Sequence, residues 1–433
     1  MHITIGITSY AELKNLSFDP EVDLLCDALH INEFSADILT DDTISAGQEA
    51  TLHDESSNIW ANYWIDYAER VDADTVRVRA RSEIAMLDGV MLEETVYTGD
   101  ALSDVLDEVM VRQTGAPGIV ATIDYTLSSA LSNATVSGYC PSQTARERLQ
   151  WVCFAVGAYV KTAFVNQITV LPLDDTAALI PLDKTFWRPT VNHGDYVTAV
   201  KVTAYTFTQD SSSAASSNAS YTFPLPWVAS TQEYTLVNQN VPSGIADNVV
   251  EISELYLINQ SNVSSILTRL ATRYFKRTEV QLDAIDNGEF VPGDKVYVYA
   301  DAQTIYTGHI QSASFKFGKQ ARATIQMVAS EQVDVSALTI NYTYDNATVH
   351  SETYYLPQGY AYSITTTYVD RTDDGRRRIY RPTLASVTGT VGTSAATVSV
   401  PCAVALELYQ DVLDIISVDG ISIASDLVTA VIQ

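Results

Sequence analysis

The sequence of 433 residues contains few of the residues that build catalytic, metal or redox sites. Its four cysteines form no C-x-x-C pair, which argues against a zinc site and a disulfide framework; they are Cys26, Cys140, Cys153 and Cys402. The six histidines form no H-E-x-x-H or H-x-H pattern, and there is no G-x-S-x-G motif or P-loop. We therefore expect buried free thiols, no catalytic residue, no metal, no cofactor and no enzymatic activity.

Positive charge is also scarce. Lysine and arginine total 25 against 53 acidic residues, which gives a formal net charge of −28. Binding to nucleic acid through phosphate neutralisation is therefore not expected. The acidic residues are concentrated near the start, where Met1 to Trp60 holds twelve of them and one lysine, Lys14. Solubility alone is an alternative explanation of this charge.

The remaining carboxylate patterns give weak signals. Four adjacent pairs occur, at Asp41-Asp42, Glu93-Glu94, Asp174-Asp175 and Asp373-Asp374. Neighbouring side chains on a strand point to opposite faces, so such pairs rarely converge on one substrate. The stretch "DAIDNGEF" (283–290) has a faint likeness to a calcium loop but lacks the full set of ligands, and a turn is predicted there.

Long membrane-spanning hydrophobic runs are not indicated either. The uncharged stretch 385–406 is long enough to cross a bilayer, but its Ser, Thr and Gly residues follow a β-like rhythm, so no membrane span is expected. The start, "MHITIGITSY", lacks a basic segment followed by a continuous apolar one. Secretion by a signal peptide is therefore not expected.

The sequence does contain strong strand and helix patterns. Strands are predicted at 2–8, 31–39, 75–86 and 90–97, the last two joined by a hairpin at Asp88-Gly89. Three helices follow. One runs from an Asp100 N-cap to a Gly115 C-cap, one begins at the capping box Thr144-x-x-Glu147, and one covers 261–277 from a Ser261 cap.

These patterns predict a mainly β fold with α+β parts. Residues 1–100 form a strand-rich domain, and 101–195 an α+β domain with further strands near 163–172 and 179–181. Residues 196–335 return to strands around the helix 261–277 and end in a three-strand meander whose first turn is Pro292-Gly293-Asp294. Residues 336–433 are β-rich.

An arginine run is the one candidate contact site. The stretch "DRTDDGRRRIYRP" contains Arg376, Arg377, Arg378 and Arg381 beside three aspartates. Its guanidinium groups could bind an acidic partner surface by bidentate pairing. The alternative is a hairpin tip whose Asp-Gly turn is flanked by compensating charges. We favour partner contact.

The order of several segments resembles the tail hub proteins of bacteriophages and contractile injection systems. These segments are "ARERLQWVCFAVGAYV" running into "ITVLPL", then "DYVTAVKVTAYTF", "ELYLINQSNVSSILTRLATRYFKR" and "PGDKVYVYADAQTIYTGHIQSASFKFGKQARATIQMVA". Together they cover roughly residues 100 to 335. No single segment is a fingerprint; the likeness lies in their order.

The resemblance implies a structural protein that forms a homotrimeric ring at the distal end of a tail tube. Each subunit would supply two tube-like antiparallel β-barrel domains, here about 1–100 and 196–335, buttressed by the peripheral α+β domain 101–195. The implied partners are tail-tube and distal-tail proteins and a tip, spike or fibre, with DNA passing through an axial channel without specific binding. The implied location is the virion tail, assembled in the host bacterial cytoplasm. The resemblance gives no role to 336–433.

Two alternatives stay open. A tail-tip protein that binds or depolymerises polysaccharide could use the 25 tyrosines and 5 tryptophans as sugar platforms. Exposed aromatics and carboxylates gathered in one groove would favour that interpretation, whereas aromatics dispersed in the core would not. A distal-tail ring protein would instead assemble with sixfold or twelvefold symmetry.

Overall fold

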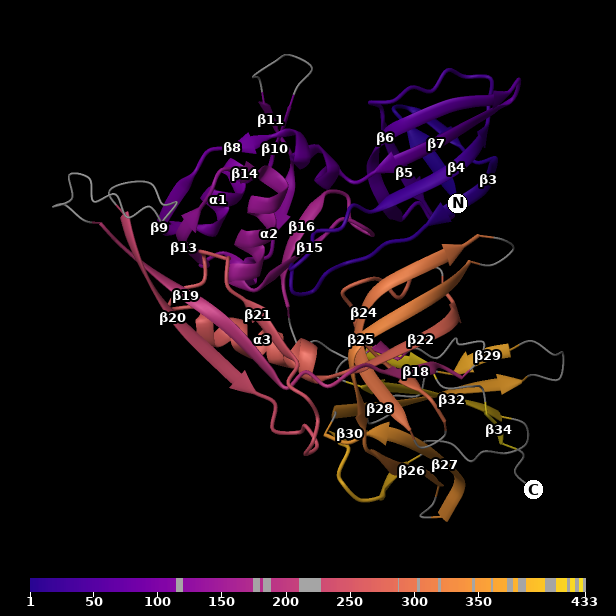
Figure 1. The fold of residues 1–433 in the computed structure, drawn as a ribbon. Coiled ribbons are helices and arrows are strands. Elements are labelled where there is room, and N and C mark those ends of the chain that lie inside the picture. The colour runs from indigo at the N-terminus through magenta and orange to yellow at the C-terminus, as the bar shows by residue number, and fades with distance from the viewer. Residues whose placement is uncertain are drawn as a thin grey trace. The chain divides into compact units, whose positions relative to one another are not determined.

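The structure, a computed structural model, describes most of the chain. The described residues are 1–113, 120–173, 180–181, 188–209, 227–286, 288–301, 304–317, 321–344, 347–359, 361–371, 377–380, 387–401, 410–418, 421–424 and 428–430. They form two compact units, the first made of 1–174, 190–294 and 309–330 and the second of the remaining residues. Within the described residues the fold is mainly β with few helices, which confirms the predicted class (Figure 1).

The described helices all lie in the first unit. The α-helices are α1 (Leu102–Val109), α2 (Ala145–Val156) and α3 (Val263–Phe275), and the short 3₁₀ helices are η1 (Glu83–Gly89) and η2 (Ser129–Leu131).

Strands of the first unit, wholly or for most of their length, are β1 (His2–Ile5), β2 (Thr8–Tyr10), β3 (Leu13–Phe18), β4 (Glu33–Leu39), β5 (Glu49–His53), β6 (Ile59–Asp72), β7 (Thr75–Arg81), β8 (Met91–Leu92), β9 (Thr95–Ala101), β10 (Val111–Gln113), β11 (Val120–Thr122), β12 (Tyr125–Leu127), β13 (Thr135–Cys140), β14 (Gln143–Thr144), β15 (Ala158–Lys161), β16 (Ile168–Pro172), β18 (Thr190–His193), β19 (Ala199–Gln209), β20 (Trp227–Val237), β21 (Val249–Ile252), β22 (Thr278–Ile285), β24 (Ile305–Lys316) and β25 (Arg322–Val333).

The largest sheet of this unit runs through both β-rich parts of the chain. Its strand order is β18-β22-β25-β24-β3-β4-β7-β6-β5-β1-β2, and the link between the early and late strands is the antiparallel pair β24 and β3, with Phe315 opposite Phe18. Among the pairings of the described residues, the end strands β18 and β2 do not meet. Closure into two barrels therefore remains a prediction.

Aromatic side chains fill the link between these strands. Phe18, Trp60 and Phe315 are 0%, 2% and 2% exposed. The ring centroids of Trp60 and Phe315 are 4.8 Å apart, and those of Trp60 and Phe164 are 5.1 Å apart. Tilted aromatic pairs of this kind stabilise the fold by more than the burial of their apolar area alone. We call Phe18, Trp60, Phe164 and Phe315 the aromatic joint.

The α+β part is built around α1 and α2. Their buried side chains share one apolar core with β9, β13, β15 and β16. The predicted capping box of α2 is confirmed: the Thr144 hydroxyl accepts from the Glu147 amide at 3.2 Å, and the Glu147 carboxylate accepts from the Thr144 amide at 2.9 Å. Helix α3 packs instead on the three-stranded sheet β20-β19-β21 (Figure 1).

The predicted C-cap of the first helix at Gly115 is wrong, because α1 ends at Val109 and the chain continues as strand β10. Two predicted N-caps are wrong by one residue. The N-cap of α1 is Ala101, because the carboxylate of Asp100 accepts from the Thr98 amide at 2.6 Å. The N-cap of α3 is Asn262, because the Ser261 hydroxyl bonds to the Asn259 side chain. Both side chains stabilise the loop before the helix and not its first turn.

The predicted hairpin at Asp88-Gly89 is also wrong. These residues end η1, in which Ile84 and Leu87 are fully buried. Strand β7 pairs with β4 and β6, whereas β8 pairs with β14. Burial of the two apolar side chains favoured a helical turn over a tight reversal.

The predicted turns around the meander are confirmed. Asp294 donates its backbone N–H to the Val291 carbonyl at 3.1 Å, and Gly293 has a φ of +101°. In the calcium-like stretch, the buried Asp286 carboxylate accepts backbone N–H groups of Gly288 and the two residues that follow it. That carboxylate therefore closes a turn, as expected.

The second unit is formed largely by C-terminal strands. They are β17 (Ile180–Pro181), β23 (Lys295–Tyr299), β26 (Val335–Tyr344), β27 (Ala347–Pro357), β28 (Ala361–Arg371), β29 (Arg377–Tyr380), β30 (Val387–Thr390), β31 (Ala396–Pro401), β32 (Gln410–Val418), β33 (Ile421–Ala424) and β34 (Val428–Ala430). Strand β26 lies between β27 and β31, while β28 pairs with β29, β30 and β32.

No helix within the described ranges has the length and apolar character needed to cross a membrane.

Candidate functional site

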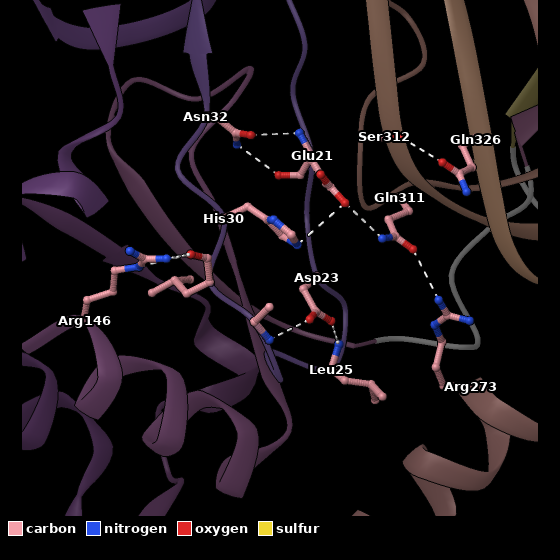
Figure 2. Close-up of polar contacts among 12 residues, drawn as sticks. Glu21, Asp23, Leu25, His30, Asn32, Arg146, Arg273, Gln311, Ser312 and Gln326 are labelled. Carbon is pink, nitrogen blue, oxygen red and sulfur yellow. Dashed lines mark hydrogen bonds and ion pairs between the residues drawn. The ribbon is translucent and has the colours of Figure 1, made fainter. Parts of the chain in front are cut away.

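The connection between β3 and β4 contacts several other elements of the first unit. Residues 19–32, which we call the strap, leave the sheet after Phe18 and return to it at Glu33. Asn32 closes the strap at its base (Figure 2): its Oδ1 accepts from the Glu21 amide at 2.8 Å and its Nδ2 donates to the Glu21 carbonyl at 3.0 Å. Nδ2 also donates to Thr162 at 2.8 Å, and Asn32 is only 5% exposed.

The apolar side chains of the strap enter three separate hydrophobic clusters. Val22 and Leu24 pack with side chains of β15, β16 and β25. Leu25 packs with α3, β19 and the end of α2. Cys26 and Leu29 belong to the core around α1 and α2. Burying one such side chain stabilises by roughly 1.5–3 kcal/mol, so this one loop ties three cores together.

The first part of the strap runs beside β24. The Val22 amide donates to the Gln311 carbonyl at 2.9 Å, and Glu21 forms a bridge with Ser312. The Gln311 side chain then links two elements, because it donates to Glu21 at 3.0 Å and accepts from Arg273 of α3 at 3.3 Å (Figure 2). The strap, which connects β3 with β4, is thus also hydrogen-bonded to β24.

The end of the strap is held by α2. Nε and Nη2 of Arg146 donate to the Leu29 carbonyl at 3.1 and 2.7 Å, while Nη1 donates to Asp88 at 2.9 Å. Gln150 donates to the backbone carbonyl of Asp27. Two side chains of one helix therefore fix two backbone carbonyls of the strap.

The carboxyl group of Asp23 shapes the turn at the middle of the strap. Its Oδ1 accepts from the Leu25 amide at 2.9 Å and its Oδ2 from the Ala28 amide at 2.8 Å. The Cys26 amide donates to the Asp23 carbonyl at 3.2 Å, and Cys26 takes a φ of +58°, which is uncommon without glycine. This turn aims successive side chains into different cores.

Asp23 and Asp27 form a titratable pair beside a cavity. The cavity has a volume of about 200 Å³ and is lined by Asp23, Leu24, Leu25, Asp27, Arg273, Tyr274, Gln311 and Val328. Burial raises the pKa of Asp23 to about 7, aided by a hydrogen bond with Asp27 and by its charge. Burial alone would raise the pKa of Asp27, but hydrogen bonds from Asp23 and Tyr274 and the charge of Arg273 lower it. The surroundings thus shift the pKa values of the two carboxyl groups in opposite directions.

The predicted arginine site is only partly covered by the structure. Arg376 and Arg381 lie outside the described residues. Arg377 and Arg378 lie on β29, opposite Arg371 and Asp370 of the antiparallel strand β28. This register agrees with the hairpin alternative, whose Asp-Gly turn falls outside the described residues. Partner contact by the run stays a prediction.

The predicted buried thiols are confirmed at three of four positions. Cys26, Cys140 and Cys153 are free and buried, and Cys402 lies outside the described residues.

The strap itself was not predicted from the sequence. The available signal was the run "VDLLCDAL" (22–29), in which apolar residues follow one another at irregular spacing between two predicted strands. Such a run fits neither the helical nor the strand period, so it indicates burial without an element.

Comparison with known proteins gives matches in structure alone. No protein-family model and no curated protein matches the chain. The 43 kDa tail protein of prophage MuSo2 from Shewanella oneidensis aligns with a TM-score of 0.50 and 10% identity, over 76% of this chain and 97% of that one. The tail protein from Neisseria meningitidis MC58 aligns with a TM-score of 0.53 and 11% identity, over 76% and 95%. The chain has the fold of phage tail proteins.

The alignments with the two tail proteins confirm the resemblance at the level of the fold. A component of the type VI secretion system from E. coli, described as structurally similar to the T4 tail proteins gp27 and gp5, aligns over 95% of both chains with 10% identity and a TM-score of 0.43.

Proposed function

We propose that the chain is a structural component of a phage or phage-like tail, and that three copies form the hub ring at the distal end of the tail tube. The ring connects the tube to the tip, spike or fibres. Its location is the virion tail, reached by assembly in the host bacterial cytoplasm. Besides the tail protein fold, the observation that carries the proposal is the continuous sheet path through β3 and β24.

A ring subunit has to transmit load between its parts, and the first unit has the contacts to do so. The aromatic joint connects the early strands with β24, and the strap connects both with α2 and α3. Large interfaces are depleted in charge at their cores, which suits a chain with only 18% charged residues. A subunit of this kind is built to hold a shape and to contact neighbours.

The acidic residues near the start support a channel through the ring. Eight of the twelve are exposed, namely Glu12, Asp19, Asp27, Glu33, Asp41, Asp42, Glu49 and Glu55. Others are neutralised by β7, since Arg77 pairs with Asp37 at 2.8 Å. A wall lined by carboxylates repels phosphates and lets DNA pass without binding it. Charge repulsion within the ring is screened over about 8 Å at physiological salt.

The test of this proposal is the mass and symmetry of the assembled chain. Native mass spectrometry of the purified chain, with the isolated tail as reference, should give a trimer. A hexamer or dodecamer would support the distal-tail ring alternative and contradict the hub.

A second candidate, polysaccharide binding at the tail tip, is favoured by one groove of the second unit. It has a volume of about 370 Å³ and is lined by Gln332, Val333, Asp334, Val335, Ala337, Tyr355 and Gln358. Tyr355 is 37% exposed, and an exposed ring beside amide and carboxylate groups suits a sugar.

Several other large aromatics argue for the structural role. Trp60, Tyr139 and Tyr297 are at most 2% exposed and lie in cores. Titration of the chain with host surface oligosaccharides, followed by NMR, separates the two candidates. Saturable chemical-shift changes that disappear in Tyr355→Ala would establish sugar binding. Without such changes, the hub would be the remaining candidate.

A further inference from the structure

The groove of the second unit lies on one face of the sheet β27-β26-β31. Residues of β26 alternate across this sheet, so that Leu338 is buried on one face while Ala337 is half-buried on the other. Ala337 lies directly opposite Tyr355 of the antiparallel strand β27, and both residues line the groove. Because the alanine side chain is a single methyl group, the exposed Tyr355 ring is open to a ligand on that side.

The backbone that carries the Tyr355 ring is held in place. The Tyr299 hydroxyl of β23 donates to the Tyr355 carbonyl at 2.7 Å, and the next residue, Leu356, is buried on the opposite face of the sheet. A tyrosine side chain has only two rotatable angles, so on a fixed backbone it loses little conformational entropy when a ligand binds. The ring is therefore a preorganised platform.

The polar groups of the groove come from the junction of β25 and β26 and from the residue that follows β27. Gln358 donates its side-chain amide to the Val335 carbonyl at 3.3 Å and its backbone N–H to the Asp334 carbonyl at 2.9 Å. Within the part of the chain that the structure describes, the side chains of Gln332 and Asp334 and the Tyr355 hydroxyl have no hydrogen-bonding partner. These groups are available to bind a ligand in the groove.

The charge of the groove limits the kind of ligand. Among the described residues that line it, Asp334 alone is charged. A ligand that carries a carboxylate or phosphate would be repelled by this carboxylate, whereas a neutral ligand would not. A hydroxyl group can donate to the same carboxylate and to the amide oxygens of Gln332 and Gln358.

Building on polysaccharide binding as the second candidate function, we propose that the groove binds a β-linked glycan of gluco-configured pyranose rings without anionic groups. In this configuration every hydroxyl is equatorial, so the two faces of the ring present C–H groups and its edge presents hydroxyls. One face packs on the Tyr355 ring, while the edge hydroxyls bind Asp334 and the two glutamines. The volume of about 370 Å³ is near the lower end for ligand pockets, which fits a short stretch of glycan.

The experiment is a ligand-observed NMR titration of the full chain with two trisaccharides. Cellotriose and the β-1,4-linked glucuronic acid trimer share the gluco configuration and the linkage and differ in charge. Cellotriose should bind saturably and at least about tenfold more tightly than the glucuronic acid trimer. Absence of saturable cellotriose binding, or equal affinity for the two trisaccharides, would overturn the proposal.

Variants of the groove separate ring packing from charge. Tyr355→Ala should weaken cellotriose binding at least about tenfold, whereas Tyr355→Phe keeps the ring and should stay within about threefold of the wild type. Asp334→Asn should bring the affinity for the glucuronic acid trimer within about threefold of that for cellotriose. Tyr67→Ala, at an exposed tyrosine of β6 in the first unit, is the matched control and should leave binding unchanged.

Three results with these variants would contradict the proposal. They are unchanged cellotriose binding in Tyr355→Ala, an equal loss in Tyr355→Phe and Tyr355→Ala, and unchanged selectivity in Asp334→Asn. If host surface oligosaccharides bind through Tyr355 while cellotriose does not, the proposed glycan is wrong and the second candidate function stands. If neither binds, both fail. The trimeric hub is tested separately, by the mass of the assembled chain.

Discussion

The aromatic joint and the strap connect parts of the first unit through different kinds of interaction. The joint is made of Phe18, Trp60, Phe164 and Phe315, which carry no titratable group. The strap combines apolar anchors with side-chain hydrogen bonds to its backbone, such as those of Asn32 and Arg146. The first connection depends on packing alone, whereas the second also depends on hydrogen bonds. The first should therefore respond to changes in side-chain volume, and the second to the loss of single hydrogen-bonding side chains.

The largest expected effect comes from the joint. Trp60→Ala should lower the free energy of unfolding by about 3–5 kcal/mol, because it leaves a cavity among three rings. Chemical denaturation followed by circular dichroism measures it. A loss below about 1 kcal/mol would mean that the joint is not the main connection between the two sets of strands.

Substitution of a glycine beside the joint should show how tightly the joint is packed. Gly288 has a φ of +86°, and a Cβ there would lie 2.9 Å from atoms of the Trp60 indole ring. Gly244 has a φ of +91° with nothing within 4 Å of its Cβ position. Gly288→Ala should cost about 2–4 kcal/mol, against about 1–2 kcal/mol of backbone strain for Gly244→Ala. Equal losses in the two variants would show that the ring moves aside freely.

Disrupting the base of the strap should lower the free energy of unfolding less than disrupting the joint does. Asn32→Ala removes three hydrogen bonds of a buried side chain and the bonds that it makes to the Glu21 backbone, so a loss of about 1–3 kcal/mol is expected. Exchange of the 19–32 peptides should speed up more than that of the joint. A uniform increase across the first unit would contradict the strap as a separate element.

The smallest effect on stability should come from the arginine run. Replacing Arg376, Arg377 and Arg378 with serine should change the free energy of unfolding by less than about 0.5 kcal/mol, because three adjacent guanidinium groups are not expected in a core. Assembly with other tail components should weaken, as measured by co-sedimentation. Loss of folding without an assembly defect would contradict the partner-contact prediction.

Much of the local structure could be predicted from residues that are close in sequence. The capping box of α2 and the turn at Gly293 were predictable because each depends on residues close in sequence. The Asp88-Gly89 hairpin failed because burial of Ile84 and Leu87 outweighed the turn preference. Tertiary packing commonly overrides such local preferences.

The strap was not predictable for the opposite reason. Its contacts join residues far apart in sequence, such as Asp27 with Tyr274 and Glu21 with Gln311. The acidic pair at positions 23 and 27 carries no motif, and the raised pKa of Asp23 arises only when the turn is buried. A sequence pattern cannot report burial that a distant helix supplies.

The central claim is the threefold hub, and the most direct measurement is an electron cryomicroscopy reconstruction of the intact tail. The account predicts three copies of this chain at the distal end of the tube, around an axial channel lined by carboxylates of the first sixty residues. Sixfold or twelvefold symmetry, a channel lined by lysine and arginine, or no axial channel would contradict it.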